Sequence, residues 1–321
     1  LSGSWYLIED ITLTKQAAVK NDLDICLNGH KIYFETSGSS ANRILMTGRE
    51  KVVEESAVNI CDCVGTGEMK KKDTKSTAKG AMLLINAQHT TSLNFYGGTF
   101  DASEISTTEI GGLLQVAGGD KSTVNVYGGK FIGAKKSLAP SGTIINLSSG
   151  AKLNLYGGEF TCKSGTADDV VGINVPSGTV NISGKVVIDG KNSATLKLGS
   201  GAGVNIKDLD TAAKLCIIPT DDKLVIKGAA EYIEQITTSD DYTVSLSGED
   251  VKIVSNNAPH EHCICGKTSD DAADIGDHKT HTDITYTALD QNAITSSNGG
   301  ALPLSGSWYL IEDITLTKQA A

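Results

Sequence analysis

The sequence is poor in aromatic residues and in arginine. Phenylalanine, tryptophan and tyrosine make up 5% of its 321 residues, and arginine occurs only at Arg43 and Arg49. The formal net charge is −10, which argues against a nucleic-acid partner because such proteins turn a basic face to the phosphates. No apolar run approaches the roughly 20 residues that a membrane-spanning helix needs, so we expect no membrane span here.

The first 18 residues return at the end of the sequence. Residues 1–18 and 304–321 both read LSGSWYLIEDITLTKQAA, so position 304 repeats position 1 and the unit is 303 residues long. Units of this kind form arrays. We therefore expect the chain to be one repeat of a longer protein, with neighbouring identical repeats, in the same or an adjoining chain, as its partners.

A shorter and looser period lies within this unit. Seven tetrapeptides alternate apolar and polar residues, as half-buried strands do. They are LDIC (23–26), VNIC (58–61), LNFY (93–96), VNVY (124–127), LNLY (153–156), VNIS (180–183) and VNIK (204–207). Their second residues lie 35, 35, 31, 29, 27 and 24 positions apart, which suits one coil of short strands per period. The last coil is predicted at 242–256.

This recurrence predicts an all-β fold, a right-handed parallel β-helix or solenoid. The predicted parts are a β-helix repeat at 1–257, a small Cys/His-rich connector at 258–303 and the start of the next identical repeat at 304–321. In each coil the first and third residues of the tetrapeptide should point inwards, and Asn and Tyr or Cys outwards. The alternative is an antiparallel β-sandwich, which also has short, regularly spaced strands. A sandwich does not explain why one tetrapeptide recurs in phase.

Several of these segments resemble a known family. SGSWYLIEDITLT, LDICLNGHKI, VNICDCVGTG and the LNFYGGTF-type coils are similar to the pectin-lyase-like β-helix repeats of large secreted surface proteins from Gram-positive gut bacteria. The resemblance covers most of residues 1–210 and extends to the HEHCICG segment. It implies a secreted, extracellular location at the cell surface, and it implies no particular reaction.

Catalytic residue types are not gathered in the patterns that β-helix enzymes use. Three pairs of adjacent acids lie in turn-rich segments without a nearby His or Arg, at 168–169, 221–222 and 240–241. His30 and His89 stand alone, and we interpret both as structural residues. The basic run of Lys70, Lys71 and Lys72 is predicted to lie in a solvated loop. We predict that the chain is not an enzyme.

One short segment concentrates metal-binding side chains. Four of the six histidines and two of the seven cysteines fall between positions 260 and 281. A C-x-C pair and an H-x-x-H pair supply two thiolates and two imidazoles, which suits tetrahedral Zn²⁺. The predicted ligands of this structural site are Cys263, Cys265, His278 and His281, with His262 or His260 able to replace one histidine. The alternatives are a flexible linker and a Cys263–Cys265 disulfide.

Cysteine and tyrosine occupy the same outward position in successive coils. Cys26 and Cys61 take in the first two coils the place that Tyr96, Tyr127 and Tyr156 take later. Strands about 4.8 Å apart would bring the two sulfur atoms together. Either a disulfide or two stacked thiols fits, and the thiols are the favoured interpretation because in-register parallel strands suit a disulfide poorly.

Together these features predict a structural role. The chain is interpreted as a repeat of an extracellular stalk or filament, a rigid spacer and display element with a metal-stabilised joint between repeats. The alternative is an adhesin module that binds host glycan or mucin through Tyr96, Tyr127 and Tyr156, because aromatic rings stack on sugars. A polysaccharide lyase ranks last.

Overall fold

Strands dominate the chain, whose structure is a computed structural model. The helical elements of the described residues are two short 3-10 turns, η1 (Gly119–Lys121) and η2 (Ala230–Gln235). None of the described helices has the length and apolar character needed to span a membrane. The structure describes residues 2–19, 21–35, 44–46, 55–72, 81–86, 90–103, 112–133, 144–147, 150–162, 170–190, 193–256, 260–263, 283–289 and 308–310.

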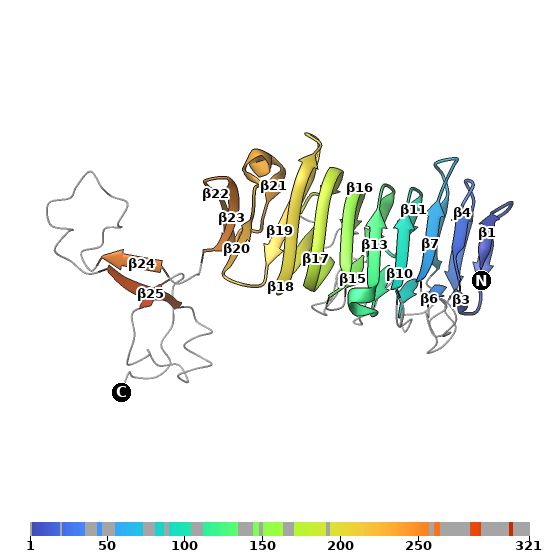
Figure 1. The fold of residues 1–321 in the computed structure, drawn as a ribbon, viewed down its shortest axis with the longest axis horizontal. Coiled ribbons are helices and arrows are strands. Elements are labelled where there is room, and N and C mark those ends of the chain that lie inside the picture. Colours follow the sequence, from blue (N-terminus) through green and yellow to red (C-terminus); the bar gives the residue numbers. More distant parts are fainter. Residues whose placement is uncertain are drawn as a thin grey trace, which may run out of the picture. The chain divides into compact units, whose positions relative to one another are not determined.

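Two compact units, Leu1–Ile253 and Val254–Ala321, make up the chain. In the first unit, each of the first twelve strands pairs in parallel with the strand three places later in the sequence. The result is a long parallel sheet, consistent with a β-helix or solenoid in which each coil contributes three strands. Figure 1 shows the successive coils lying side by side from blue β1 to yellow β18.

The strands fall into three stacks. The first contains β1 (Gly3–Tyr6), β4 (Leu23–Cys26), β7 (Glu55–Cys61), β10 (Thr90–Phe95) and β13 (Ser122–Val126). The second contains β2 (Ile11–Leu13), β5 (Lys31–Glu35), β8 (Glu68–Lys72), β11 (Thr99–Asp101) and β14 (Lys130–Gly133). The third contains β3 (Ala17–Val19), β6 (Ile44–Met46), β9 (Leu83–Ile85), β12 (Leu114–Val116) and β15 (Ile145–Leu147).

Beyond residue 150 the strands of neighbouring stacks merge. The long strand β16 (Lys152–Cys162) pairs with both β13 and β14, so one strand serves two stacks. β17 (Val170–Ile188) and β18 (Ala194–Leu209) pair along most of their length, with register shifts where the chain bends. β19 (Lys214–Pro219) and β21 (Ile236–Thr237) complete the sheet. The merging follows the shortening of the sequence period, which leaves fewer residues for turns.

Apolar side chains of all three stacks meet in one core. The tetrapeptide pattern fixes this arrangement, because Leu23, Val58 and Leu93 are buried at the first position of successive coils and Ile60 and Phe95 at the third. A second layer follows the Gly-Gly turns, where the rings of Phe100, Phe131 and Phe160 stack with centroids 4.9 and 4.8 Å apart. The second glycine of these turns adopts positive φ, for example 110° at Gly129, which few other residues tolerate.

The all-β class and the parallel pairing predicted from the sequence are confirmed, and the antiparallel sandwich is wrong. Two finer predictions are also wrong. Residues 242–256 are not another coil of the main sheet, since β22 (Tyr242–Ser247) and β23 (Asp250–Ser255) form a separate three-stranded sheet with β20 (Lys223–Ile226).

The second wrong prediction concerns the lysine run. Lys70, Lys71 and Lys72 do not lie in a solvated loop but form the end of β8, which pairs with β5 on one side and β11 on the other. Alternation along the strand turns Met69 and Lys71 inwards, and Lys71 is only 1% exposed. Lys70 instead forms an ion pair with Asp101, with nitrogen and oxygen 2.9 Å apart.

The second unit contains three described strands. β24 (His260–Cys263) pairs antiparallel with β25 (Asp283–Leu289), and β25 pairs in parallel with β26 (Trp308–Leu310). In the parallel pair Thr287 lies opposite Trp308, Ala288 opposite Tyr309 and Leu289 opposite Leu310. The predicted boundaries at 257 and 303 stay predictions.

Candidate functional site

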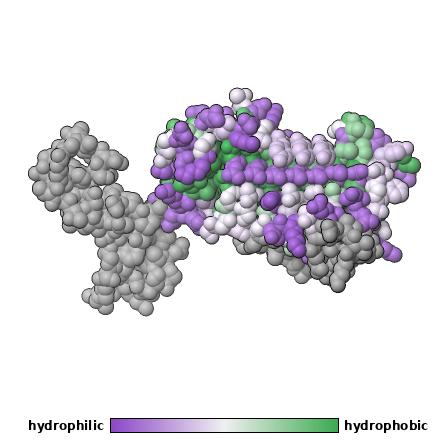
Figure 2. Space-filling view, viewed as in Figure 1, coloured by the Kyte–Doolittle hydropathy of each residue, from purple (hydrophilic) through white to green (hydrophobic). Residues whose placement is uncertain are grey.

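An unbroken polar ladder runs along the outer face of the first stack. Each asparagine donates a hydrogen bond from Nδ2 to the side-chain oxygen one coil earlier, at distances between 2.7 and 2.9 Å. The ladder contains Asp24, Asn59, Asn94, Asn125, Asn154, Asn181 and Asn205. Figure 2 shows a narrow, continuous hydrophilic row along this body, as such a ladder produces.

The ladder begins at a carboxylate. Ser4 Oγ donates to Asp24 at 2.6 Å, and Asn59 Nδ2 donates to its other oxygen at 2.8 Å. These two hydrogen bonds, that of Ser4 first, lower the pKa of Asp24, so the group remains ionised in moderate acid. A charged acceptor at the end of the row accounts for the common direction in which the amides donate.

A second row, of tyrosines, runs beside the asparagines. The rings of Tyr96 and Tyr127 are 4.8 Å apart and those of Tyr127 and Tyr156 are 5.0 Å apart, with interplanar angles of 4° and 14°. Although the side chains are 42–52% exposed, they cover one another's faces. Tyr127 is covered on both faces, so the surface it offers to solvent is its ring edge and its hydroxyl group.

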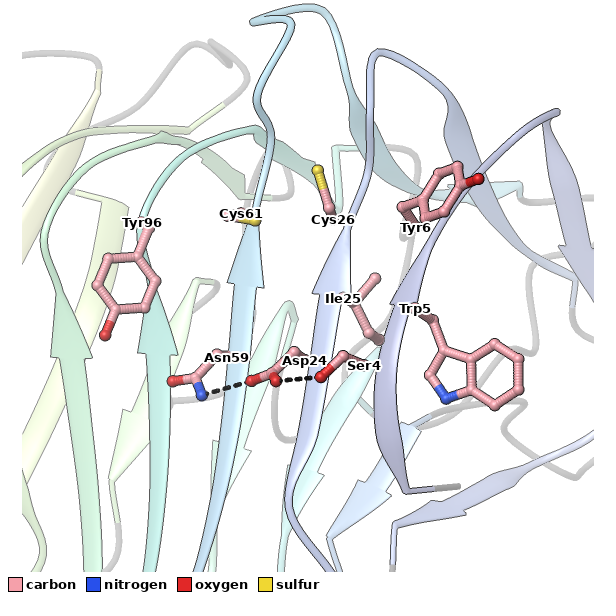
Figure 3. Close-up of a pocket in the computed structure, with 9 residues that line it drawn as sticks. All are labelled: Ser4, Trp5, Tyr6, Asp24, Ile25, Cys26, Asn59, Cys61 and Tyr96. Atoms are coloured by element: carbon pink, nitrogen blue, oxygen red, sulfur yellow. Dashed lines mark hydrogen bonds between the residues drawn. The ribbon is translucent and has the colours of Figure 1, made fainter.

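The row continues beyond Tyr96 with a gap. Cys61 and Cys26 take the next two places, and Tyr6 takes the one after, because Tyr6 lies opposite Cys26 and Cys26 opposite Cys61. Since cysteine is much smaller than tyrosine, a hollow of about 450 Å³ opens over the two sulfur atoms. Figure 3 shows Tyr96 and Tyr6 at its two ends, with Cys61 and Cys26 between them.

Two of the residues that line this hollow are cysteines, and a third cysteine contacts one of them. The prediction that Cys26 and Cys61 stack is confirmed by the strand register, and both are free thiols. Cys63 was not predicted to join this pair. Its Sγ accepts a hydrogen bond from Cys26 Sγ at 3.3 Å and donates one to Asn28 Oδ1 at 3.4 Å. The available signal was the closeness of Cys63 to Cys61 in the sequence, although strand alternation does not apply to Cys63, which lies in the bend after β7.

The three thiols differ in acidity. Burial, reinforced by the neighbouring Cys26, raises the pKa of Cys61 to about 11. Burial also acts on Cys26, but the hydrogen bonds that its thiolate accepts from the side chain and backbone of Cys63 and from the backbone of Asn28 outweigh burial and lower the pKa of Cys26. The pKa of exposed Cys63 is raised, chiefly by its hydrogen bond with Cys26. Cys26 is therefore the thiol that ionises first.

The other described candidates from the sequence lie in turns of the first unit. His30 lies in the turn after β4, with Nδ1 3.6 Å from Asp10 Oδ1. The acid pairs at 221–222 and 240–241 lie in two turns of the first unit, before β20 and before β22. His89 and the pair at 168–169 lie outside the described residues. Burial, and after it the charges of Asp241, Asp222 and Asp221, raise the pKa of Tyr242, so the structure brings the two described acid pairs near the same side chain.

The predicted zinc ligands lie mostly outside the described part of the chain. The backbone of His260, His262 and Cys263 forms β24, whereas Cys265, His278 and His281 are not among the described residues. Within the described residues no cluster of His, Cys, Asp and Glu has a metal-binding arrangement. The zinc site stays a prediction.

No protein-family model, curated protein or solved structure matches this chain.

Proposed function

We propose that this chain is a repeat of an extracellular stalk or filament, a right-handed parallel β-helix that acts as a rigid spacer. The observation that carries the proposal is the in-register ladder from Asp24 to Asn205, which ties each coil to the next through side chains as well as backbone. A ladder of this kind resists bending between coils, because bending lengthens hydrogen bonds on one side.

The stacking also sets a length. The first stack continues through β16, β17 and β18, so eight strands lie in line. At about 4.8 Å per step, the seven steps between them span about 34 Å. A spacer built this way lengthens by a fixed amount with each repeat.

Electron microscopy of proteins with two, four and six tandem repeats tests the spacer role. We expect straight particles whose length grows linearly with the number of repeats. Particles whose end-to-end distance varies widely at a fixed repeat number would overturn the proposal, because they would show repeats that move independently.

The location is proposed on the sequence resemblance alone. Its segments are similar to pectin-lyase-like repeats of secreted surface proteins from Gram-positive gut bacteria, and a stalk serves such a surface by holding a distal domain away from it. Labelling of intact cells with an antibody against the first unit tests this. Labelling only after cell lysis would contradict it.

We further propose that a structural Zn²⁺ ion in the connector orders the joint between repeats. Cys263, Cys265, His278 and His281 supply the ligands, with His262 as the substitute for a histidine. Thiolate and imidazole ligands suit zinc, and metal binding compensates for the small size of such a segment. One equivalent of zinc per repeat, lost in Cys263→Ser but kept in Cys216→Ser, is the expected result. Equal zinc content in both variants would overturn the site.

A second candidate function is glycan binding, which the hollow between Tyr6 and Tyr96 favours. Tyr96 has a neighbour on one face in Tyr127, and its other side borders the hollow, where a sugar ring has room to stack. On a glycan array we expect binding to disappear in Tyr96→Ala and to persist in Tyr156→Ala, which does not line the hollow. Absence of binding by the unaltered chain would remove this candidate, and turnover of a uronic polymer would favour a lyase instead.

A further inference from the structure

The core of the first unit is open at β1. Trp5 occupies the inward position that Ile25 and Ile60 occupy in the next two coils, because the three residues lie opposite one another in the strand register. Ile25 is 7% and Ile60 0% exposed, but Trp5 is 62% exposed. Tyr6 and Ile8, at 68% and 75%, are exposed beside it. An apolar end of this kind is a surface that another strand can cover.

The backbone of β1 is also open on one side. Within the described residues β1 pairs with β4 alone, so its other edge presents backbone groups that no described strand meets. Open edges of parallel sheets are sites of strand addition. A strand added to this edge would therefore both pair with the backbone of β1 and cover Trp5.

The same chain contains a second copy of this strand with a partner. Trp308, Tyr309 and Leu310 repeat Trp5, Tyr6 and Leu7 within the identical 18-residue segments. They form β26, which pairs in parallel with β25. β25 thus pairs with the copied segment in the same way as a strand of the first unit pairs, in parallel, with the equivalent strand of the next coil.

We propose that residues 283–289 of a second copy of this sequence add as a parallel strand to the open edge of β1. The register is that of β25 and β26, which places Thr287 opposite Trp5, Ala288 opposite Tyr6 and Leu289 opposite Leu7. The proposal rests on the proposed function, because it needs a second copy next in line. This pairing would be the contact that joins consecutive β-helices into one continuous stack.

The composition of the added segment favours strand formation. DITYTAL contains β-branched and aromatic residues, which favour strands, and it lacks glycine and proline. The residue in register with Tyr6 is the small Ala288, so the outer row meets little steric resistance at the junction. Parallel strands cannot be joined by a tight turn, and 18 residues lie between Leu289 and Trp308, enough for a crossover.

The test releases β25 from its partner within the full chain. Trp308→Pro with Tyr309→Pro removes the backbone donors of β26 and leaves residues 283–289 free to pair elsewhere. We expect this variant, unlike the unaltered chain, to associate head to tail, with a sedimentation coefficient that rises with concentration. The N–H groups of Gly3 and Leu7 already donate to the neighbouring coil, so those of Ser4 and Tyr6 lie on the open side, and their hydrogen exchange should slow about tenfold or more as the variant associates.

A matched control removes the added strand as well. Adding Thr287→Pro and Ala288→Pro to the first variant should abolish both the association and the slower exchange. Two results would overturn the proposal. One is association that survives this change, and the other is exchange at Ser4 and Tyr6 that is as fast in the first variant as in the unaltered chain. If proteins with tandem repeats nevertheless form straight particles whose length increases by a constant amount per repeat, the spacer role stands and only the proposed pairing of residues 283–289 with β1 is wrong.

Discussion

At the scale of single residues, the asparagine side chains of the outer ladder form hydrogen bonds between neighbouring coils, as backbone groups do between the strands of a sheet. Each amide inside the row donates one hydrogen bond and accepts one, so its polarity is satisfied along the axis of the stack. A buried or half-buried amide that loses its partner costs more than the hydrogen bond itself contributes. The stabilisation should therefore depend on position within the row.

Asn125→Ala tests this dependence. The change removes two hydrogen bonds and leaves partly buried groups of Asn94 and Asn154 without partners, so we expect a loss of about 1–3 kcal/mol in the free energy of unfolding. Asn205→Ala, which removes one exposed hydrogen bond, should cost less than about 1 kcal/mol. Denaturant titration gives both values, and equal losses would contradict the role of the ladder.

The thiol cluster makes a second prediction at this scale. Thiolates, not thiols, react with iodoacetamide, and with a pKa of about 11 Cys61 is ionised at pH 8 in about one molecule in a thousand. Because its pKa is lowered, Cys26 should be alkylated first and Cys61 last. Peptide mass spectrometry after timed quenching measures the order. Faster alkylation of Cys61 than of Cys26 would contradict the cluster as described.

At the scale of elements, Asp62 holds the turn between the first and second stacks. Its carboxylate accepts backbone hydrogen bonds from Gly29 of the preceding coil at 2.8 Å and from Gly67 at 2.6 Å. Burial opposes ionisation, but these hydrogen bonds prevail and the pKa of Asp62 is lowered. Asp62 therefore links its own turn, through Gly67, to the turn of the preceding coil, through Gly29.

A pH dependence follows from Asp62. Because its pKa is lower in the folded chain, the stability it contributes is complete above the unfolded value of about 3.9 and is lost as the pH falls through the folded value. Asp62→Asn should lower stability at pH 7 by about 1–3 kcal/mol and flatten its decline in acid. Exposed Asp221→Asn serves as the control. An unchanged acid profile in Asp62→Asn would contradict this assignment.

The element scale also shows what could be predicted from the sequence. The tetrapeptides predicted β4, β7, β10 and β13, because alternation and recurrence in phase leave one way to bury their apolar residues. The position of Lys71 could not be predicted from composition, since its strand is fixed by pairing with neighbours on both sides. Residues 242–256 alternate as a coil does, and local alternation does not specify which sheet a strand joins.

At the scale of the whole molecule, a rigid stalk requires that the stacking of coils within the first unit continue from one repeat to the next. Within the first unit the outer tyrosines, the asparagine ladder and the inner phenylalanines all follow one axis. The tyrosine positions were predicted as a row, but their mutual coverage was not, because ring orientation depends on the spacing of neighbouring coils. That coverage makes the row better suited to stiffness than to binding, except at the gap over Cys26 and Cys61.

The rigidity of consecutive repeats is tested most directly by pulsed dipolar electron paramagnetic resonance. Spin labels carried by a noncanonical amino acid at the Lys152 position of two successive repeats report the distribution of the distance between them. A stiff spacer predicts a single narrow distribution, unchanged by the number of repeats on either side. A broad distribution, of the width expected for a flexible linker, would contradict the central claim that these repeats form a stalk.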